Sequence, residues 1–467
     1  MLCERDRDLK RRPVLPLLVF IFIQAVLASD VTFHDPTVGY DSGDHLRYIA
    51  TLAHFELPDR DQTIEFFSPP LPYAVPALAK AIGGLSNWWA GKVGQIVNLI
   101  FSIGLCWCVL KICDELMPGS IRMQCWSLAL LAIVPVYYKS FSMVRGEPLL
   151  AFMVTASVYW TLRAYRTTAR QWRDFIILGM LLGLAILSRQ WAFLIFPALA
   201  AFALLLPASS TTQRVLNLKP LMVSFAIAAL VGGWFYLSLN MRFGKLTTFS
   251  RTPKPWSLSD QPARFYFGLG LDSLFSDPIR PAYVDEFIPM FYSEFWGDYQ
   301  CYFLVYGRRR MGDFLSGITL KNSLDREPLP HSFTTNRFRI AASLGRAQAA
   351  SMVPSLVFLG GLGMGTLAIF GIGTENRRLG LLAMVVVFSM LGYFAFTIRF
   401  ANLVTGDTIK ATYMLQIVPM LAILGARFLM AIEDRFPRGF RALAAMLALS
   451  AILNAPFLFT RYVTLPW

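Results

Sequence analysis

The stretch VLPLLVFIFIQAVLAS, residues 14–29, decides the fold because it carries no charge and is apolar almost throughout. Similar runs recur along all 467 residues, which are 55% hydrophobic and only 15% charged. Runs of about 17–25 apolar residues, coiled as helices, match the thickness of a bilayer's hydrocarbon core. Backbone groups in lipid must be satisfied within the segment, and these runs lack the alternation of a barrel strand. The sequence therefore predicts an all-α polytopic membrane protein.

Hydropathy predicts about eleven membrane-spanning helices. They are expected at residues 14–29, 91–113, 123–141, 148–165, 174–187, 190–206, 220–240, 353–371, 380–398, 412–431 and 443–460. The segment 69–84 is also apolar, but it contains four prolines. We interpret it as a helix at the membrane surface rather than a span.

The basic residues of the short loops indicate the orientation. With eleven spans, all of these loops fall on one side, as expected for the cytoplasmic side. If residues 69–84 also spanned the bilayer, the later loops would change sides and the agreement would be lost. The N-terminus is therefore expected in the cytoplasm and the C-terminus in the periplasm, and a bacterial inner membrane is favoured because no retention signal ends the chain. The residues that carry this argument are Arg5, Arg7, Lys10, Arg11, Arg12, Arg166, Arg170, Arg173, Arg214, Lys219, Arg377, Arg378, Arg435, Arg438 and Arg441.

This topology divides the chain into three regions. Residues 1–240 form a transmembrane core of seven spans that includes an acidic outer loop at 30–70. Residues 241–352 form a large outer loop, too long for a simple connector, which we interpret as a partly helical cap over the site. Residues 353–467 supply the remaining spans.

The outer loop at residues 30–70 differs from the rest of this basic chain, whose net charge is +14. It holds eight acidic residues and three of the four histidines, His34, His45 and His54. Histidine and carboxylate side chains suit a divalent metal ion, although the histidines do not have a tight ligand spacing. We expect a functional site that requires no cofactor, with the metal site as an alternative. A second alternative is a solvated loop whose acids keep it outside the membrane.

Two segments of this loop carry a resemblance to a known family. Residues 39–48 read GYDSGDHLRY, and residues 65–73 read EFFSPPLPY. An acidic turn after the first span, followed by E-x-x-x-P-P-L-x-Y, resembles the first outer loop of GT-C-fold glycosyltransferases. The likeness is greatest to the branch of protein O-mannosyltransferases and lipid A aminoarabinose transferases. Further segments resemble that branch in the same order along the chain, at residues 145–150, 183–190 and 410–415.

The resemblance implies transfer of a sugar from a polyprenyl-phosphate carrier to a lipid, glycan or protein acceptor on the outer face, with inversion. The family's adjacent acidic pair is replaced here by Asp41 and Asp44, three residues apart. A positioned carboxylate can act as the base for an acceptor hydroxyl. We expect Asp41 to be this base, with Asp44 as the second candidate.

The leaving phosphate requires cations, and Arg189, Lys410 and Arg399 lie near the outer ends of predicted spans. Long basic side chains also anchor helix ends at the interface, which is the alternative for each of them. The expected acceptor-binding or positioning residues are His45, Glu65, Glu147 and Tyr413. Glu147 has a second interpretation, as an acid favoured by the dipole at a helix start.

Other functional classes make different demands on the sequence. A lipid or glycan transporter or flippase would place ionisable residues within the spans or show repeated halves, and the predicted span interiors are nearly free of charge. A non-enzymatic assembly subunit would tolerate loss of both Asp41 and Asp44. The expected partners are the lipid-linked donor, the acceptor and membrane lipids; nucleic acid is not expected, because the positive charge follows the topology.

Overall fold

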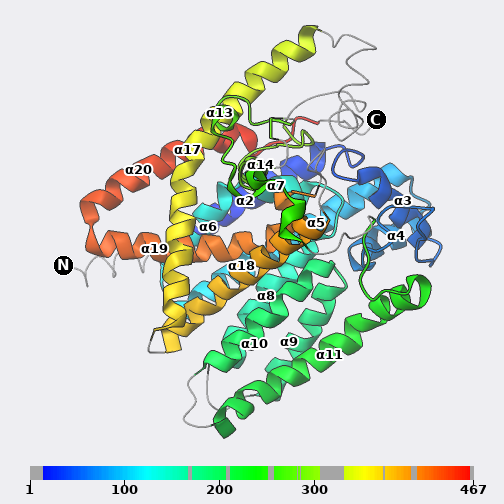
Figure 1. Ribbon diagram of the computed structural model, residues 1–467, viewed down its shortest axis with the longest axis horizontal. Coiled ribbons are helices and arrows are strands. Elements are labelled where there is room, and N and C mark those ends of the chain that lie inside the picture. Colours follow the sequence, from blue (N-terminus) through cyan, green and yellow to red (C-terminus); the bar gives the residue numbers. More distant parts are fainter. Residues whose placement is uncertain are drawn as a thin grey trace.

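The computed structural model describes residues 14–166, 171–206, 211–250, 257–280, 282–283, 286–304, 331–371, 374–400 and 408–462. Within these residues the fold consists of helices and connecting loops, without a β-sheet (Figure 1). The predicted all-α fold is confirmed. The basic residues near the N-terminus that supported the predicted orientation lie outside the described residues.

Each of the eleven predicted spans coincides with a helix or with a pair of consecutive helices. They are α2 (Val14–Phe33), α5 (Asn87–Leu116), α6 with α7 (Ile121–Ala132 and Pro135–Ser142), α8 (Glu147–Ala164), α9 (Trp172–Ile186), η1 with α10 (Gln190–Leu194 and Ile195–Leu205), α11 (Thr211–Phe243), α17 (His331–Ile369), α18 (Thr374–Arg399), η3 with α19 (Ala411–Ile417 and Val418–Arg435), and α20 (Pro437–Asn454).

Seven of the described helices are long and apolar enough to cross a bilayer on their own. The number becomes eight if α6 and α7, which meet at a bend of 67°, form one broken span. Eleven spans are compatible with this arrangement but exceed the number supported by length and composition. The shorter helices α8 and α9 pack against each other, and α9 also packs against α11.

Close packing between α9 and α11 depends on small residues. A Cβ atom on Gly183 would lie 2.5 Å from Val231 Cβ, and one on Gly232 would lie 2.3 Å from Ile186 Cγ1. Both distances are too short for any side chain, so glycine lets the two helices approach (Figure 1).

Two short helices of the outer loop lie beside the long ones. These are α3 (Ser42–Leu52) and α4 (Leu71–Gly83), which pack against each other and against α5. Helix α4 occupies the proline-rich segment that we predicted to be a non-spanning helix, and it does not meet the criteria for a span.

Helix α17 begins at His331, well before the span predicted at residues 353–371. Hydropathy detects only the apolar part of a helix, whereas residues 331–352 continue the same helix with more polar side chains. The described part of the cap contains short helices, as we expected: η2 (Leu258–Asp260), α12 (Ala263–Phe267), α13 (Leu271–Leu274) and α14 (Phe287–Phe295).

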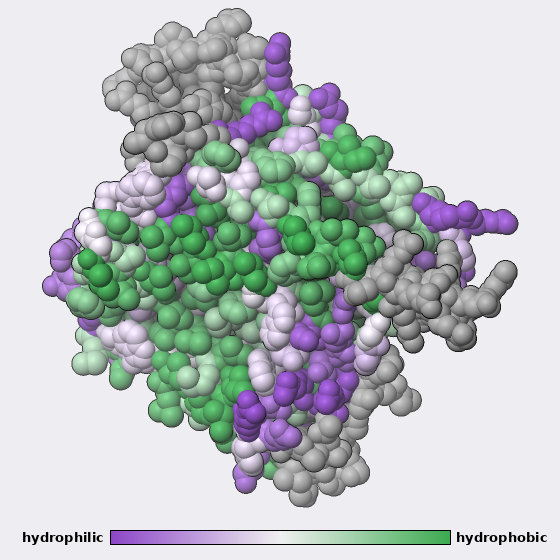
Figure 2. All heavy atoms as spheres, turned by 180° about the vertical axis from the view of Figure 1, so that it is seen from behind, coloured by the Kyte–Doolittle hydropathy of each residue, from purple (hydrophilic) through white to green (hydrophobic). Residues whose placement is uncertain are grey.

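Large apolar side chains cover much of the surface (Figure 2). Leu230 of α11 is 80% exposed, Leu359 of α17 is 63% exposed and Ile452 of α20 is 68% exposed. Such extensive exposed apolar surface suits lipid rather than water. The protein is therefore an integral membrane protein with several spans.

Candidate functional site

Asp41 stands at the start of α3 in a left-handed backbone conformation, with φ 54° and ψ 25°. Aspartate tolerates this region better than most residues. Its Oδ2 atom lies 3.1 Å from Lys410 Nζ, and the Asp41 side chain is 32% exposed. The pair joins the first outer loop to the segment before α19. The Asp41 carboxylate therefore has a fixed cationic partner and is still partly exposed at the protein surface.

The pKa of Asp41 reflects opposing effects. Burial raises it, whereas Lys410 and, to a smaller extent, His45 and Arg145 lower it. The lowering is the larger effect in total, so the pKa lies below the usual value and Asp41 is ionised at neutral pH.

Asp44 has a different environment. Its Oδ1 atom accepts hydrogen bonds from Arg47 Nη2 at 2.7 Å, Thr63 Oγ1 at 3.1 Å and Ile64 N at 3.1 Å. These contacts fasten α3 to the loop that carries Glu65. The structure thus gives Asp44 a role in holding the loop, and the sequence alone did not separate it from Asp41.

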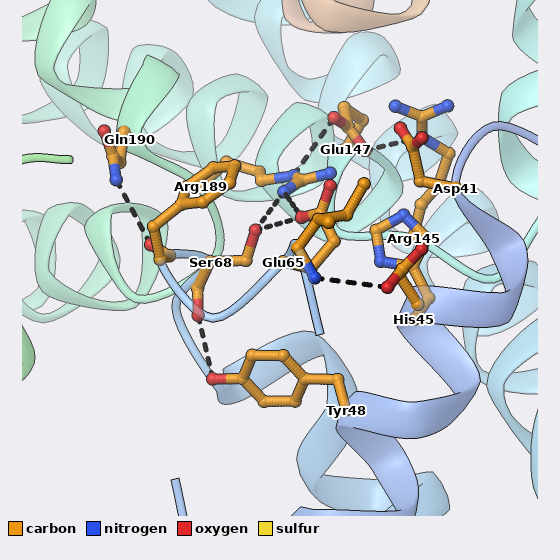
Figure 3. A network of polar contacts seen from close by, with 12 residues as sticks. Asp41, His45, Tyr48, Glu65, Ser68, Arg145, Glu147, Arg189 and Gln190 are labelled. Carbon is orange, nitrogen blue, oxygen red and sulfur yellow. Dashed lines mark hydrogen bonds and ion pairs between the residues drawn. The ribbon is translucent and has the colours of Figure 1, made fainter. Parts of the chain in front are cut away.

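Glu65, Glu147 and Arg189 form a buried ion-pair network at the centre of the site (Figure 3). Arg189 Nη1 lies 2.8 Å from Glu65 Oε2, and Arg189 Nε lies 3.0 Å from Glu147 Oε1. Arg145 Nε donates to Glu147 Oε2 at 2.6 Å. Burial raises the pKa of Glu65, but Arg189 and His45 lower it more, so this carboxylate is also ionised.

A second layer of hydrogen bonds positions the Glu65 loop. Ser68 Oγ donates to Glu65 and accepts from Arg189, while the Ser68 carbonyl accepts from Tyr48 Oη at 2.8 Å. Gln190 Nε2 donates to the Phe67 carbonyl at 3.1 Å. Figure 3 shows these contacts on one side of Arg189. The outer loop is therefore fixed to the turn between α9 and η1.

His45 lies near this network and interacts electrostatically with Glu65 and Arg189. Its Nδ1 atom is 2.8 Å from Tyr73 Oη, and the two rings stack with centroids 5.6 Å apart. Burial lowers the pKa of His45 although Glu65 opposes this, so the ring is neutral at pH 7. His45 and Glu65 thus lie close enough to Asp41 to interact with it electrostatically.

Sequence reasoning did not assign roles to Tyr40 and Arg145. Arg145 Cζ lies 4.9 Å from the centroid of the Tyr40 ring and 5.7 Å from that of Tyr413. Lys410 Nζ lies 5.1 Å and 5.5 Å from the same two centroids. The sequence offered one indication of these two residues, namely their position. Tyr40 directly precedes Asp41, and Arg145 lies in the segment 145–150 that carries the resemblance.

A cavity of about 550 Å³ opens beside this network. Arg189, Arg399 and Tyr413 line it, whereas Lys410 is not among its lining residues. The predicted phosphate ligands therefore occupy different positions: Arg189 is buried, Arg399 is exposed at the cavity, and Lys410 is paired with Asp41. The other lining residues include two more cations, Arg60 and Lys245, and an aromatic set of Phe66, Phe67, Trp191, Phe193, Phe249, Phe396 and Phe400.

The cap reaches the site through a buried lysine. Lys139 of α7 pairs with Glu294 of α14, lies 3.8 Å from Asp298 Oδ1, and donates to the Gly297 carbonyl at 3.0 Å. Burial and the neighbouring Asp298 raise the pKa of Glu294 well above its usual value. The expectation that span interiors are nearly free of charge is wrong at Lys139, which falls inside a predicted span.

The three histidines proposed as metal ligands do not meet. His34 is buried, with Nδ1 2.7 Å from Thr460 Oγ1, and burial lowers its pKa to about 4. His45 contacts Tyr73, and His54 is exposed. In the part of the chain that the structure describes, no group of three or more His, Cys, Asp or Glu side chains is arranged to hold a metal ion. The histidine metal site is therefore not supported.

Comparisons with known proteins agree with this architecture. Residues 68–234 match the model of a family described as dolichyl-phosphate-mannose-protein mannosyltransferase. No curated protein sequence matches the chain. The structure resembles the oligosaccharyltransferase of Archaeoglobus fulgidus tethered with an acceptor peptide containing the NVT sequon, at a TM-score of 0.53 and 15% identity over 96% of this chain and 56% of that one.

Two further solved structures are similar. One is AglB from Archaeoglobus fulgidus with an inhibitory peptide and a dolichol-phosphate, at a TM-score of 0.50 and 14% identity over 96% of this chain and 56% of that one. The other is ArnT from Cupriavidus metallidurans bound to undecaprenyl phosphate. Its TM-score is 0.40 and its sequence identity 13%, over 90% of this chain and 79% of that one. A structure of the Archaeoglobus enzyme also contains zinc and sulfate.

The chain has the GT-C fold of membrane glycosyltransferases, which confirms the fold implied by the sequence resemblance. It spans just over half the length of the archaeal oligosaccharyltransferase chains.

Proposed function

We propose that the protein is a membrane glycosyltransferase that moves a sugar from a polyprenyl-phosphate carrier to a lipid, glycan or protein acceptor on the outer face, with inversion. The Asp41–Lys410 pair carries this proposal, because it places an ionised, partly exposed carboxylate beside a cation. Lys410 also contacts Tyr413, which lines the cationic cavity. The GT-C fold and the match of residues 68–234 support the same class of reaction.

Asp41 would act as the base. The acceptor hydroxyl loses its proton to the carboxylate while its oxygen attacks the anomeric carbon, and the bond from that carbon to the carrier phosphate breaks. A phosphate is a good leaving group, so one carboxylate suffices. Glycoside hydrolases, in contrast, need a second carboxyl group to protonate a poor leaving group.

The cations would stabilise the departing phosphate. Arg399 lies at the cavity where a lipid-linked donor would enter, and Arg189 lies deeper, beside Tyr413. Lys410 and Arg145 flank Tyr413 on the side of Asp41. Glu65 and Glu147 would act as positioning residues, because both hold the guanidinium of Arg189.

We propose that this chemistry needs no resident metal ion. The carboxylates of Asp41, Glu65 and Glu147 each have a cationic partner within the chain: Lys410 for Asp41, Arg189 for Glu65, and Arg145 with Arg189 for Glu147. Transfer should therefore survive exhaustive chelation, with readdition of divalent ions as the control. Activity that disappears on chelation and returns with one ion would refute this point.

We also propose that the protein lies in a bacterial inner membrane with its N-terminus in the cytoplasm and its C-terminus in the periplasm. The distribution of basic residues along the sequence supports this orientation. Reporter fusions at the C-terminus and within residues 166–173, scored for periplasmic or cytoplasmic activity, would test it.

The function itself is tested with the purified full-length chain in detergent and radiolabelled polyprenyl-phosphate sugars. We expect release or transfer of the sugar that depends on the carrier phosphate. If no carrier supports binding or turnover, the proposal fails. Movement of lipid across vesicles without sugar transfer would then favour the transporter.

A further inference from the structure

The ring of Tyr40 lies among cations from three segments. Arg145 Cζ is 4.9 Å, Lys410 Nζ 5.1 Å and Lys139 Nζ 5.9 Å from its centroid. The ring of Tyr302, in the cap, packs edge-on at 4.9 Å, and Tyr40 is only 2% exposed. Cation–ring attraction and packing explain why an aromatic residue stands here.

Packing does not explain the hydroxyl group. Tyr40 Oη is buried and has no hydrogen-bond partner among the described residues. Phenylalanine would keep the same ring contacts without the cost of a desolvated hydroxyl. In the same part of the structure, Arg145 Nη1 is also buried without a described partner. Two unpartnered donors in one cationic cluster indicate an acceptor that the protein itself does not supply.

We propose that Tyr40 Oη donates a hydrogen bond to the phosphate of the sugar donor, an inference that rests on the proposed function. Phosphate oxygens accept strongly from hydroxyl and guanidinium groups together. Tyr40 adjoins Asp41 in sequence, and Lys410 contacts both residues. The phosphate is thereby placed near the base, and inversion then requires the acceptor hydroxyl at Asp41 to approach the anomeric carbon from the face opposite the phosphate.

A phosphate bound at Tyr40 would also change the electrostatic environment of Asp41. Arg145 is paired with Glu147 and Lys410 with Asp41 before any donor arrives. A phosphate bound at Tyr40 competes with Asp41 for Lys410. As Lys410 turns toward the phosphate, Asp41 loses its nearest counter-ion and becomes a stronger base. Donor binding thus prepares the carboxylate for the acceptor.

The test is the variant Tyr40→Phe in the full-length protein, compared with wild type. Binding of a radiolabelled polyprenyl monophosphate is measured beside binding of the uncharged polyprenol of equal length. We expect the affinity for the monophosphate to fall about tenfold or more, since a hydrogen bond to a charged group is lost. Affinity for the polyprenol should not change, and the thermal unfolding temperature should be equal or higher.

Tyr138→Phe is the matched control. Its hydroxyl is also buried but donates to the Ala132 carbonyl at 2.8 Å, so this variant should lower the unfolding temperature and keep phosphate affinity. Unchanged monophosphate affinity in Tyr40→Phe would overturn the inference. Equal losses for the monophosphate and the polyprenol would do so too, because they would point to ring packing. A wild-type protein that binds no polyprenyl phosphate would instead refute the proposed function.

Discussion

Lys410 Nζ lies 3.1 Å from Asp41 Oδ2, although the two residues are 369 positions apart in the chain. The Lys410 backbone is itself fixed, because its N–H donates to Tyr393 Oη at 2.6 Å. Tyr393 Oη in turn donates to the Thr408 carbonyl at 2.9 Å. The first and last thirds of the sequence thus meet at one carboxylate, whereas Glu65 of the same loop meets a cation from the middle of the chain, Arg189.

Replacing Asp41 with asparagine should reduce transfer about 10²–10⁴-fold, the usual contribution of a general base. Donor binding should persist or strengthen, because Lys410 is released from its partner. Steady-state transfer and direct binding of the lipid-linked donor measure the two effects.

Asp44→Asn is the control for this prediction. It weakens the contacts to Arg47, Thr63 and Ile64, so it should lower thermal stability while transfer continues. If Asp41→Asn keeps near wild-type transfer and Asp44→Asn loses it, the two assignments must be exchanged.

The acidic side of the pH profile should depend on Lys410. In the wild type, Lys410 holds the pKa of Asp41 below its usual value of about 3.9, so kcat should stay constant as pH falls until it reaches that region. In Lys410→Met, burial remains and its raising effect is no longer opposed by the lysine. The acidic limb of kcat at saturating donor should therefore move to higher pH. A limb that stays in place would argue that another group titrates.

Physical rules explain why the fold could be predicted from the sequence. A run such as residues 14–29 cannot leave its backbone unpaired in lipid, so it must be a helix. The prolines between residues 69 and 84 indicated a helix that does not span the membrane. Helix α4, which occupies this segment, has only 13 residues. The start of α17 was missed because its first turns are polar, and hydropathy reports composition rather than helix length.

The site was predicted less completely, because ion pairs depend on three-dimensional neighbours. The loop motifs drew attention to Asp41 and Glu65, and Arg189 was proposed because it lies near the end of a predicted span. Nothing in their spacing indicated which carboxylate meets which cation. Lys139 stands in an apolar run, and the sequence did not show that Glu294 and Asp298, more than 150 positions away, lie next to it. The spacing of the histidines, in turn, did not show that His34 and His54 lie away from the network.

Arg189→Lys should weaken donor binding more than acceptor binding. Lysine keeps the charge but cannot contact Glu65, Ser68 and Glu147 at once, as the forked guanidinium does. We expect KM for the lipid-linked donor to rise about tenfold or more, with a smaller change for the acceptor. Arg399→Lys is the control, because that side chain is exposed at the cavity and should tolerate the exchange. The opposite pattern, with the acceptor affected more, would remove Arg189 from the donor site.

The cap should depend on Lys139 more than on Glu294. Lys139→Met removes the buried cation that pairs with Glu294, lies 3.8 Å from Asp298 Oδ1 and donates to the Gly297 carbonyl. Loss of one partner of a buried ion pair costs about 3–5 kcal/mol. Glu294→Gln should cost much less, because the raised pKa of Glu294 makes its neutral form accessible in the wild type and glutamine imitates that form.

Cys301, which is buried in the same segment, provides the measurement: maleimide labelling mapped by mass spectrometry should accelerate strongly in Lys139→Met and little in Glu294→Gln. Labelling of the half-buried Cys125 should be equal in both variants and serves as the internal standard. Equal acceleration at Cys301 in the two variants would mean that Glu294 is the ionised partner of Lys139.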